Sequence, residues 1–296
     1  MRTTDGARRG AAVTVAAVVL ALAGGCTSAD PGPPPADPGA SGPAQAPPAT
    51  AVVALGDSIS VGFAACGSPS PCEEESWATG TDPRVASLRQ RLAGVDGEGA
   101  GEEPLGANLA VPGARAADLA AQAAQVDLPG PGLVTVMVGA NDVCTSSAAT
   151  MTPPAAFRAS IDAALAQVRS RAPQASVLVT SVPDVVAVAA GLEGEAVARA
   201  TWARTRACRS VLDGAAPAEV SQRVDDLDRE LVEACAAVEG CTHDGGAVSA
   251  WRPALDDLSE VDAFHPSVTG QAQLAEALWP AAQRALSAPG AAAAAG

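Results

Sequence analysis

Apolar and polar residues follow two kinds of pattern along the chain. Short apolar runs bounded by Gly, Pro or polar residues have the length of buried strands, and the longer stretches between them repeat apolar residues at helical spacing. Residues 240–263 show neither pattern and are predicted to be irregular. The pattern predicts strands at 52–55, 106–111, 133–138 and 176–182, and helices at 82–93, 114–126, 154–171, 193–215, 218–238 and 267–286.

Strands that alternate with helices need crossover connections, which build parallel sheets covered by helices on both faces. We therefore predict one α/β domain at 51–286, a three-layer α/β/α sandwich with a central parallel sheet, followed by a disordered tail at 287–296. In such sheets, reactive groups collect beyond the carboxyl ends of the strands. Candidate chemistry should therefore be sought in the loops that follow the strands.

The first 50 residues do not belong to this domain pattern. Residues 1–25 combine an arginine-bearing start, a short apolar run and small residues, which is the form of a signal peptide. The segment that ends at Cys26 resembles a bacterial lipobox, so Cys26 is predicted to be the lipidated first residue of a cell-surface lipoprotein; ordinary cleavage and secretion is the alternative. Residues 27–50 are a Pro/Ala-rich disordered tether that could extend about 75 Å.

Composition narrows the classes of partner and chemistry. The chain has 18 basic and 33 acidic residues and a net charge of −15, which argues against nucleic acid or an anionic bilayer as the main partner. Membrane contact is expected only through the lipid anchor, and the protein is expected to be a monomer. All basic residues are Arg, so a Schiff-base lysine is excluded, and a histidine base must be His243 or His265.

Polar motifs at the predicted strand ends and near the end of the chain supply the parts of a serine nucleophile site. Ser58 follows the first strand in Gly-Asp-Ser, in a turn predicted to lead into a helix, and is the candidate nucleophile. His265 is the candidate base, and Asp262, three residues earlier, could hold its ring in the tautomer that accepts a proton. The backbone N–H groups of Ser58 and Gly113 and the side-chain amide of Asn141 are candidate oxyanion donors. Taken singly, these residues could instead be a helix cap, a loop glycine, a turn residue and a surface acid.

Together, these motifs resemble the SGNH hydrolases of the GDSL lipase and esterase family. Ser58, Gly113, Asn141 and His265 match the family's four characteristic positions, and the resemblance covers about 52–279. It implies a flavodoxin-like fold and hydrolysis of acyl esters through an acyl-enzyme on Ser58, without metal or cofactor. Segments 76–80, 108–119, 141–144 and 264–267 are also similar to the phospholipase B-like branch, which implies a lipid or (lyso)phospholipid ester. A carbohydrate acetyl esterase and a non-catalytic surface binding lipoprotein are the alternatives.

Seven cysteines leave six once Cys26 is set aside, an even number that fits three disulfides in an exported protein. Six cysteines allow 15 pairings. Two pairs are close in sequence and would close local loops, which leaves one long-range pair. His243 next to Cys241 could belong to a metal site, but export favours disulfides, so no metal is predicted. The predicted pairs are Cys66–Cys72, Cys144–Cys208 and Cys235–Cys241.

Overall fold

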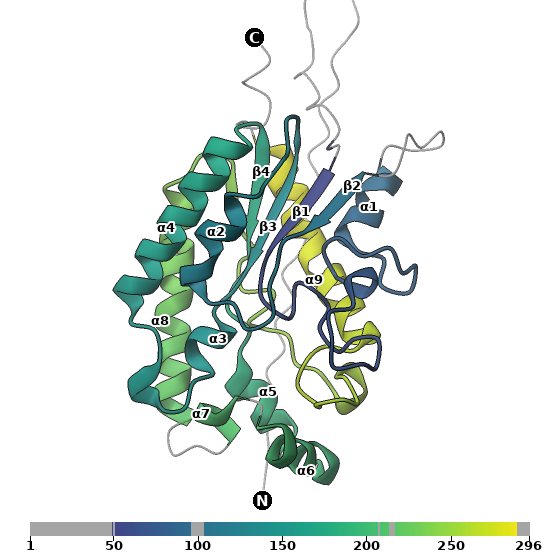
Figure 1. Cartoon of the computed structure of the whole chain (residues 1–296), viewed down its shortest axis with the longest axis vertical. Coiled ribbons are helices and arrows are strands. Elements are labelled where there is room, and N and C mark those ends of the chain that lie inside the picture. Colours follow the sequence, from purple (N-terminus) through teal and green to yellow (C-terminus); the bar gives the residue numbers. More distant parts are fainter. Residues whose placement is uncertain (1–48, 50, 96–103, 207, 213–216, 289–296) are drawn as a thin grey trace, which may run out of the picture. The chain divides into compact units, whose positions relative to one another are not determined.

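The computed structural model describes residues 49, 51–95, 104–206, 208–212 and 217–288, all within the compact unit that begins at Gln45 (Figure 1). The predicted signal peptide 1–25, the predicted lipidation site Cys26, the tether 27–50 apart from Ala49, and residues 289–296 of the predicted tail 287–296 lie outside the described residues. Ser287 is the last residue of the last described helix, Val268–Ser287, so the tail does not begin at residue 287. Among the described residues, no helix is both long enough and apolar enough to cross a membrane.

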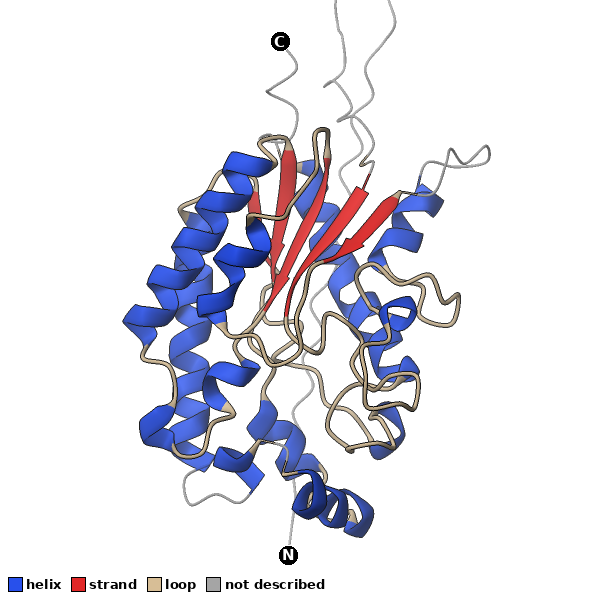
Figure 2. Cartoon of the chain, in the orientation of Figure 1, coloured by secondary structure: helices blue, strands red, loops and turns tan. Residues whose placement is uncertain are grey.

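Five parallel strands form the central sheet in the order β2-β1-β3-β4-β5 (Figure 2). This is the flavodoxin-like strand order, and the predicted α/β fold with a parallel sheet is confirmed. Every residue of β1 is buried, because β1 has a strand on each edge and helices on each face. The strands are β1 (Ala51–Gly56), β2 (Leu105–Asn108), β3 (Gly132–Met137), β4 (Ala175–Val179) and β5 (Cys241–His243).

Helices cover the two faces of the sheet and bury two separate apolar clusters. Strand β1 divides its side chains between them: Val53 and Leu55 join the first cluster, whereas Val52 and Ala54 join the second, as the two-residue period of a strand requires. The first cluster packs against α2 (Leu119–Ala123), α4 (Pro154–Arg171) and α8 (Pro217–Ala236), and the second against α1 (Leu88–Val95) and α9 (Val268–Ser287). The shorter elements are η1 (Glu73–Glu75), η2 (Ala116–Asp118), α3 (Ala140–Val143), η3 (Ala148–Thr150) and η4 (Leu255–Asp257).

The predicted long helix at 193–215 is wrong. Within that range the chain instead forms α6 (Ala196–Thr205) and α7 (Arg209–Leu212), and a separate helix, α5 (Val185–Gly191), precedes the range. Helix α6 ends where Arg206 adopts a left-handed backbone conformation with φ +56°, which a continuous helix cannot contain. Helices α5 and α6 lie beyond the carboxyl ends of the strands, on the side of the sheet where the functional motifs were predicted (Figure 2).

Two further expectations are corrected by local backbone conformation. Helix α1 starts at Leu88 and not at residue 82, because Ala86 has φ +48°. The region predicted as irregular contains β5, which pairs in parallel with β4. Three residues are too few to show a strand period, so only the neighbouring strand could have identified it.

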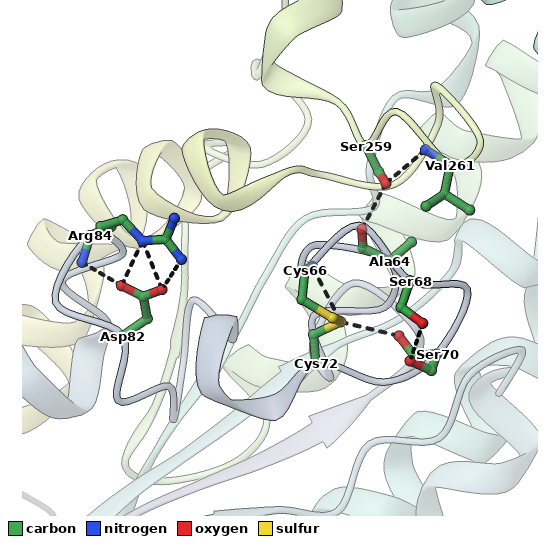
Figure 3. The surroundings of a disulfide bond; sticks show 9 residues. All are labelled: Ala64, Cys66, Ser68, Ser70, Cys72, Asp82, Arg84, Ser259 and Val261. Atoms are coloured by element: carbon green, nitrogen blue, oxygen red, sulfur yellow. Dashed lines mark hydrogen bonds and ion pairs between the residues drawn. A yellow bond between two sulfur atoms is a disulfide. The ribbon is translucent and has the colours of Figure 1, made fainter.

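The structure joins all six remaining cysteines in the predicted pairs, Cys66–Cys72, Cys144–Cys208 and Cys235–Cys241. The first disulfide closes the loop that follows the Ser58 turn, as Figure 3 shows. The second connects Cys144, directly after α3, to Cys208 before α7. Two of the three therefore brace loops beside the predicted site.

Candidate active site

Ser58 lies two residues after β1, at the carboxyl end of this central strand. The strand ends at Gly56, whose φ of +145° and close approach to the Met137 carbonyl of β3 leave no room for a Cβ. The predicted helix after Ser58 is wrong. Residues 57–65 form consecutive turns, called here the nucleophile turn, with the Phe63 N–H donating to the Ser58 carbonyl at 2.9 Å. A helix dipole therefore does not act on Ser58.

The structure brings Ser58, His265 and Asp262 together. His265 Nε2 lies 2.8 Å from Ser58 Oγ, and His265 Nδ1 lies 2.5 Å from Asp262 Oδ2. Because the carboxylate accepts the Nδ1 proton, Nε2 is left free to accept the serine proton. This is the arrangement of a nucleophile, its base and the group that orients the base.

The carboxylate of Asp262 is fixed by its own loop. Its Oδ1 accepts the backbone N–H groups of Phe264 and His265, each at 3.0 Å, which aims Oδ2 at the imidazole. Burial works to raise the pKa of Asp262, but the hydrogen bonds and the charge interaction with His265 outweigh it and hold the pKa below its ordinary value. The group is therefore a carboxylate at neutral pH, as an orienting partner must be.

Two aromatic rings confine the imidazole. The Phe63 ring centroid lies 5.0 Å from that of His265, and the Phe264 ring lies 5.3 Å away, edge to face. These contacts restrict rotation of the His265 side chain away from Ser58. The base is therefore held by packing as well as by hydrogen bonds.

The predicted oxyanion donors lie next to the nucleophile turn. Asn141 follows β3 on α3, and its Nδ2 donates to the Ala114 carbonyl at 3.0 Å and lies 3.5 Å from Asp57 Oδ2. Gly113 precedes Ala114 and has φ +83°. Within the described part of the chain, the backbone N–H groups of Ser58 and Gly113 donate to no protein atom. All the predicted site residues therefore gather in one region, and two donors are available to a ligand.

The order and spacing of these motifs are matched by one protein family. The chain matches the family of GDSL-like lipases and acylhydrolases over residues 52–278. It belongs to this family. The resemblance seen in the motifs is thereby confirmed, whereas membership of the phospholipase B-like branch stays a prediction. Family members act on ester bonds, so the protein is an ester hydrolase.

Several solved structures are similar to this GDSL-like hydrolase at low sequence identity. Phospholipase A1 from Streptomyces albidoflavus NA297 is 19% identical, with a TM-score of 0.48 over 80% of this chain and 99% of that chain. The extracellular lipase from Streptomyces rimosus is 22% identical, with a TM-score of 0.46 over 80% and 100%. The acetylxylan esterase Axe2 from Geobacillus stearothermophilus, in a catalytic mutant, is 15% identical, with a TM-score of 0.48 over 81% and 95%. No curated protein sequence gives a significant match.

Asp57 is a buried carboxyl beside the nucleophile that the sequence did not identify as unusual. Its Oδ1 accepts the Ile59 N–H at 3.0 Å. Complete burial raises the pKa of Asp57 from 3.8 to about 6, although the Ile59 N–H and His265 work against the rise. Burial likewise raises the pKa of Asp142, whose Oδ2 accepts the Ala116 N–H at 3.1 Å.

Two buried glutamines that sequence reasoning missed hold the nucleophile turn. Gln122 of α2 both donates to and accepts from the Gly56 backbone, at 2.9 and 2.8 Å. Gln271 of α9 donates to the Ile59 carbonyl at 3.0 Å and accepts from the Trp77 N–H at 3.0 Å. The available signal was an amide side chain on the apolar face of a predicted helix, where a buried polar group needs partners.

The predicted alternative metal residue, His243, lies at the end of β5, away from the triad contacts. Its Nδ1 accepts the Gly245 N–H at 3.1 Å, and burial lowers its pKa. Cys66, Cys72 and Glu75 place possible ligand atoms near one another, but the two sulfur atoms are joined in a disulfide and offer no thiolate. Neither group has the chemistry of a preformed metal site.

Proposed function

We propose that this GDSL-like hydrolase cleaves acyl esters through a covalent acyl-enzyme on Ser58. The observation that carries the proposal is the continuous hydrogen-bonded path from Ser58 Oγ through His265 to Asp262, at 2.8 and 2.5 Å. His265 supplies the base and Asp262 the group that orients it, so these two residues are sufficient to activate Ser58.

In the first half-reaction, Ser58 Oγ bonds to the ester carbonyl carbon while its proton moves to His265 Nε2. The carbonyl electron pair moves onto oxygen, and the resulting oxyanion accepts hydrogen bonds from the Ser58 and Gly113 N–H groups and from Asn141 Nδ2. Collapse of this intermediate breaks the bond to the alcohol oxygen, which takes the proton from His265.

In the second half-reaction, water attacks the acyl carbon and gives its proton to His265 Nε2. The new oxyanion accepts hydrogen bonds from the same donors, and its collapse returns the proton to Ser58 Oγ as the carboxylic acid leaves. The alcohol leaves in the first half-reaction and the acid in the second, and the return of the proton to Ser58 Oγ restores the enzyme.

As substrate we propose an ester with an apolar acyl chain, in the lipid or (lyso)phospholipid class. A cavity of about 330 Å³ opens beside Gly113, and most of its wall is apolar or uncharged. In the proposed mechanism the Gly113 N–H donates to the carbonyl oxygen of the ester, and the acyl chain begins at that carbonyl carbon. The position of the cavity beside Gly113 therefore supports an acyl chain as its occupant. Export and lipid attachment at Cys26 remain predictions of the sequence. The cavity is lined by Val111, Pro112, Gly113, Ala114, Asp118, Ala121, Gln122 and Gln125.

The decisive experiment is Ser58→Ala, assayed with a short p-nitrophenyl ester and a fluorophosphonate probe. We expect kcat to fall by roughly 10⁴-fold or more and labelling to disappear, because the attacking oxygen is lost. Ser68→Ala, an exposed serine in the following loop, is the control and should retain full activity. Retained labelling of Ser58→Ala would refute the proposal.

A panel of substrates tests the substrate class separately. We expect longer acyl p-nitrophenyl esters and acyl glycerophospholipids to be hydrolysed. Hydrolysis of acetylated sugars alone would identify a carbohydrate acetyl esterase, and no hydrolysis of any ester would identify a binding protein.

A further inference from the structure

Residues 258–266, called here the acid–base loop, are closed at their base. Leu258 and Pro266 form an antiparallel bridge, and the Ser259 N–H donates to the His265 carbonyl at 2.8 Å. The Ser259 carbonyl accepts the Ala263 N–H at 2.7 Å. The backbone of Ser259 therefore fixes the internal shape of the loop that carries Asp262 and His265.

The side chain of Ser259 connects this loop to the nucleophile turn. Its Oγ donates to the Ala64 carbonyl at 2.7 Å and accepts the Val261 N–H at 3.2 Å, as Figure 3 shows. In the described part of the chain, Ser259 and His265 are the only residues of the acid–base loop whose side chains hydrogen-bond to the nucleophile turn. Two side-chain hydrogen bonds therefore connect the loop that carries His265 with the turn that carries Ser58.

The accepting side of this contact is itself fixed. Ala64 has φ +62°, a left-handed conformation uncommon for alanine, and its N–H donates to the Ser70 carbonyl at 3.0 Å. The Cys66–Cys72 disulfide closes the loop that contains Ser70, directly after Ala64 (Figure 3). The Ser259 hydroxyl therefore binds a carbonyl whose orientation is set by the loop after the nucleophile.

A second contact joins the acid–base loop to α6. Trp202 of α6 donates its indole N–H to the Ala263 carbonyl at 2.8 Å, and Ala263 has φ +51°. Trp202, Ala263 and Leu258 belong to a small apolar cluster separate from the two main ones. An alanine stays in the left-handed backbone region only where surrounding contacts fix it. Here the Trp202 indole N–H supplies the hydrogen-bond partner that the buried Ala263 carbonyl needs.

We propose that Ser259 and Trp202 are positioning residues that hold His265 at transfer distance from Ser58, one from the nucleophile turn and one from α6. This inference rests on the proposed roles of Ser58 and His265. Neither residue reaches the reacting atoms. Their effect is on the placement of the base, where an error of ~1 Å can cost ~10²-fold in rate.

The test for Ser259 is Ser259→Ala, which removes the hydroxyl and leaves the backbone hydrogen bonds. We expect kcat to fall about 10-fold with KM changed less than about twofold, and the rate of fluorophosphonate labelling to fall in parallel. The end-point of labelling counts correctly folded sites, so loss of folded protein is separated from loss of activation.

The matched control is Ser87→Ala. The Ser87 hydroxyl is also buried, donates to the Gly80 carbonyl at 2.7 Å and accepts the Gln90 N–H at 3.3 Å, but it joins α1 to a loop outside the site. We expect unchanged kcat and labelling rate, with a comparable change in melting temperature. Equal losses of kcat in the two variants would mean that Ser259 acts only through stability and would overturn its role.

The test for Trp202 is Trp202→Phe, which keeps the ring and removes the donor. We expect kcat to fall ~3-fold with KM retained. Trp251→Phe is its control, because Trp251 Nε1 donates to Gln273 Oε1 at 2.8 Å and not to the acid–base loop. Unchanged kcat in Trp202→Phe would overturn the role of Trp202.

A double substitution tests whether both residues act through His265. In a His265→Ala background, whose residual labelling no longer uses the imidazole, Ser259→Ala and Trp202→Phe should change the labelling rate by less than about twofold. If Ser259→Ala and Trp202→Phe lowered the labelling rate as much in the His265→Ala background as in the wild type, the inference would be overturned. If Ser58→Ala itself retained activity, the proposed function would fail instead, so the two failures are distinguishable.

Discussion

The proton-transfer side and the oxyanion side of the site differ in how complete they are without a substrate. On the first side, Ser58, His265 and Asp262 already form hydrogen bonds of 2.8 and 2.5 Å. On the second, the Ser58 and Gly113 N–H groups donate to no protein atom in the described residues, and Asn141 Nδ2 has one good acceptor at 3.0 Å and a second contact at 3.5 Å.

The hydrogen bonds of the proton-transfer side form in the folded protein alone, whereas those of the oxyanion side need a bound ester. The fold alone sets up the nucleophile and its base. In the proposed mechanism, these donors gain an acceptor when negative charge develops on a bound ester, which would stabilise the transition state more than the ground state. Substitutions on the two sides should therefore have different signatures.

The largest effect after Ser58→Ala is expected for Asp262→Asn. The amide oxygen can still accept the Phe264 and His265 N–H groups, but its NH₂ faces His265 Nδ1 and favours the tautomer that cannot accept the serine proton. We expect kcat to fall by roughly 10³–10⁴-fold with little change in fold, measured by steady-state kinetics and circular dichroism. Asp256→Asn, an exposed acid before the same loop, should behave as wild type. A loss below about 10-fold would show that Asp262 does not orient the base.

A smaller effect, on the oxyanion side, is expected for Asn141→Ala. Removing one donor should lower kcat by roughly 10²-fold and leave KM nearly unchanged, because the amide interacts most strongly with the charge formed in the transition state. Gln222→Ala removes an exposed amide from α8 and serves as the control. A rise in KM with constant kcat would instead place Asn141 in ground-state binding.

The change with the smallest expected effect on kcat is at Asp57, which lies between the two sides, because its predicted effect is on stability. The pKa of Asp57 is about 6 in the folded protein, above the ordinary value of 3.8, so the folded state binds the Asp57 proton more tightly than the unfolded state does. The resulting contribution to the free energy of unfolding is present at low pH and is lost as pH rises from about 4 through 6. Asp57→Asn cannot ionise, so its stability relative to wild type should increase over that range, by up to ~3 kcal/mol near pH 7. Urea unfolding at pH 4, 6 and 7.5 measures this. A difference that does not depend on pH would contradict the assignment.

The sequence predicted the reactive residues better than the elements that hold them. Ser58, Asn141 and His265 were identifiable because a nucleophile, a donor and a base need particular side chains in particular motifs. The nucleophile turn was mistaken for a helix, because its left-handed Gly62 and Ala64 depend on contacts with later segments. Local propensity does not contain those contacts.

Helix boundaries were predicted correctly where the apolar repeat was long. They were predicted wrongly where tertiary contacts determine where a helix ends. Helix α4 begins and ends at the predicted residues, because its apolar period runs without interruption. Residues 193–215 were predicted as one continuous helix, yet α6 ends at Arg206, and Trp202 within α6 donates to the Ala263 carbonyl. That contact joins residues 61 positions apart, and no window of local sequence includes both.

The residues of the triad are separated in the chain by 207 positions, from the first strand to the segment before α9. During synthesis, Ser58 emerges long before its base exists. On the proposed roles of Ser58 and His265, a partly made or partly folded chain has a nucleophile without its base. We therefore expect ester cleavage during refolding to appear only once the segment that carries His265 has packed against the nucleophile turn. Its rate would report completion of the site and not the early steps of folding.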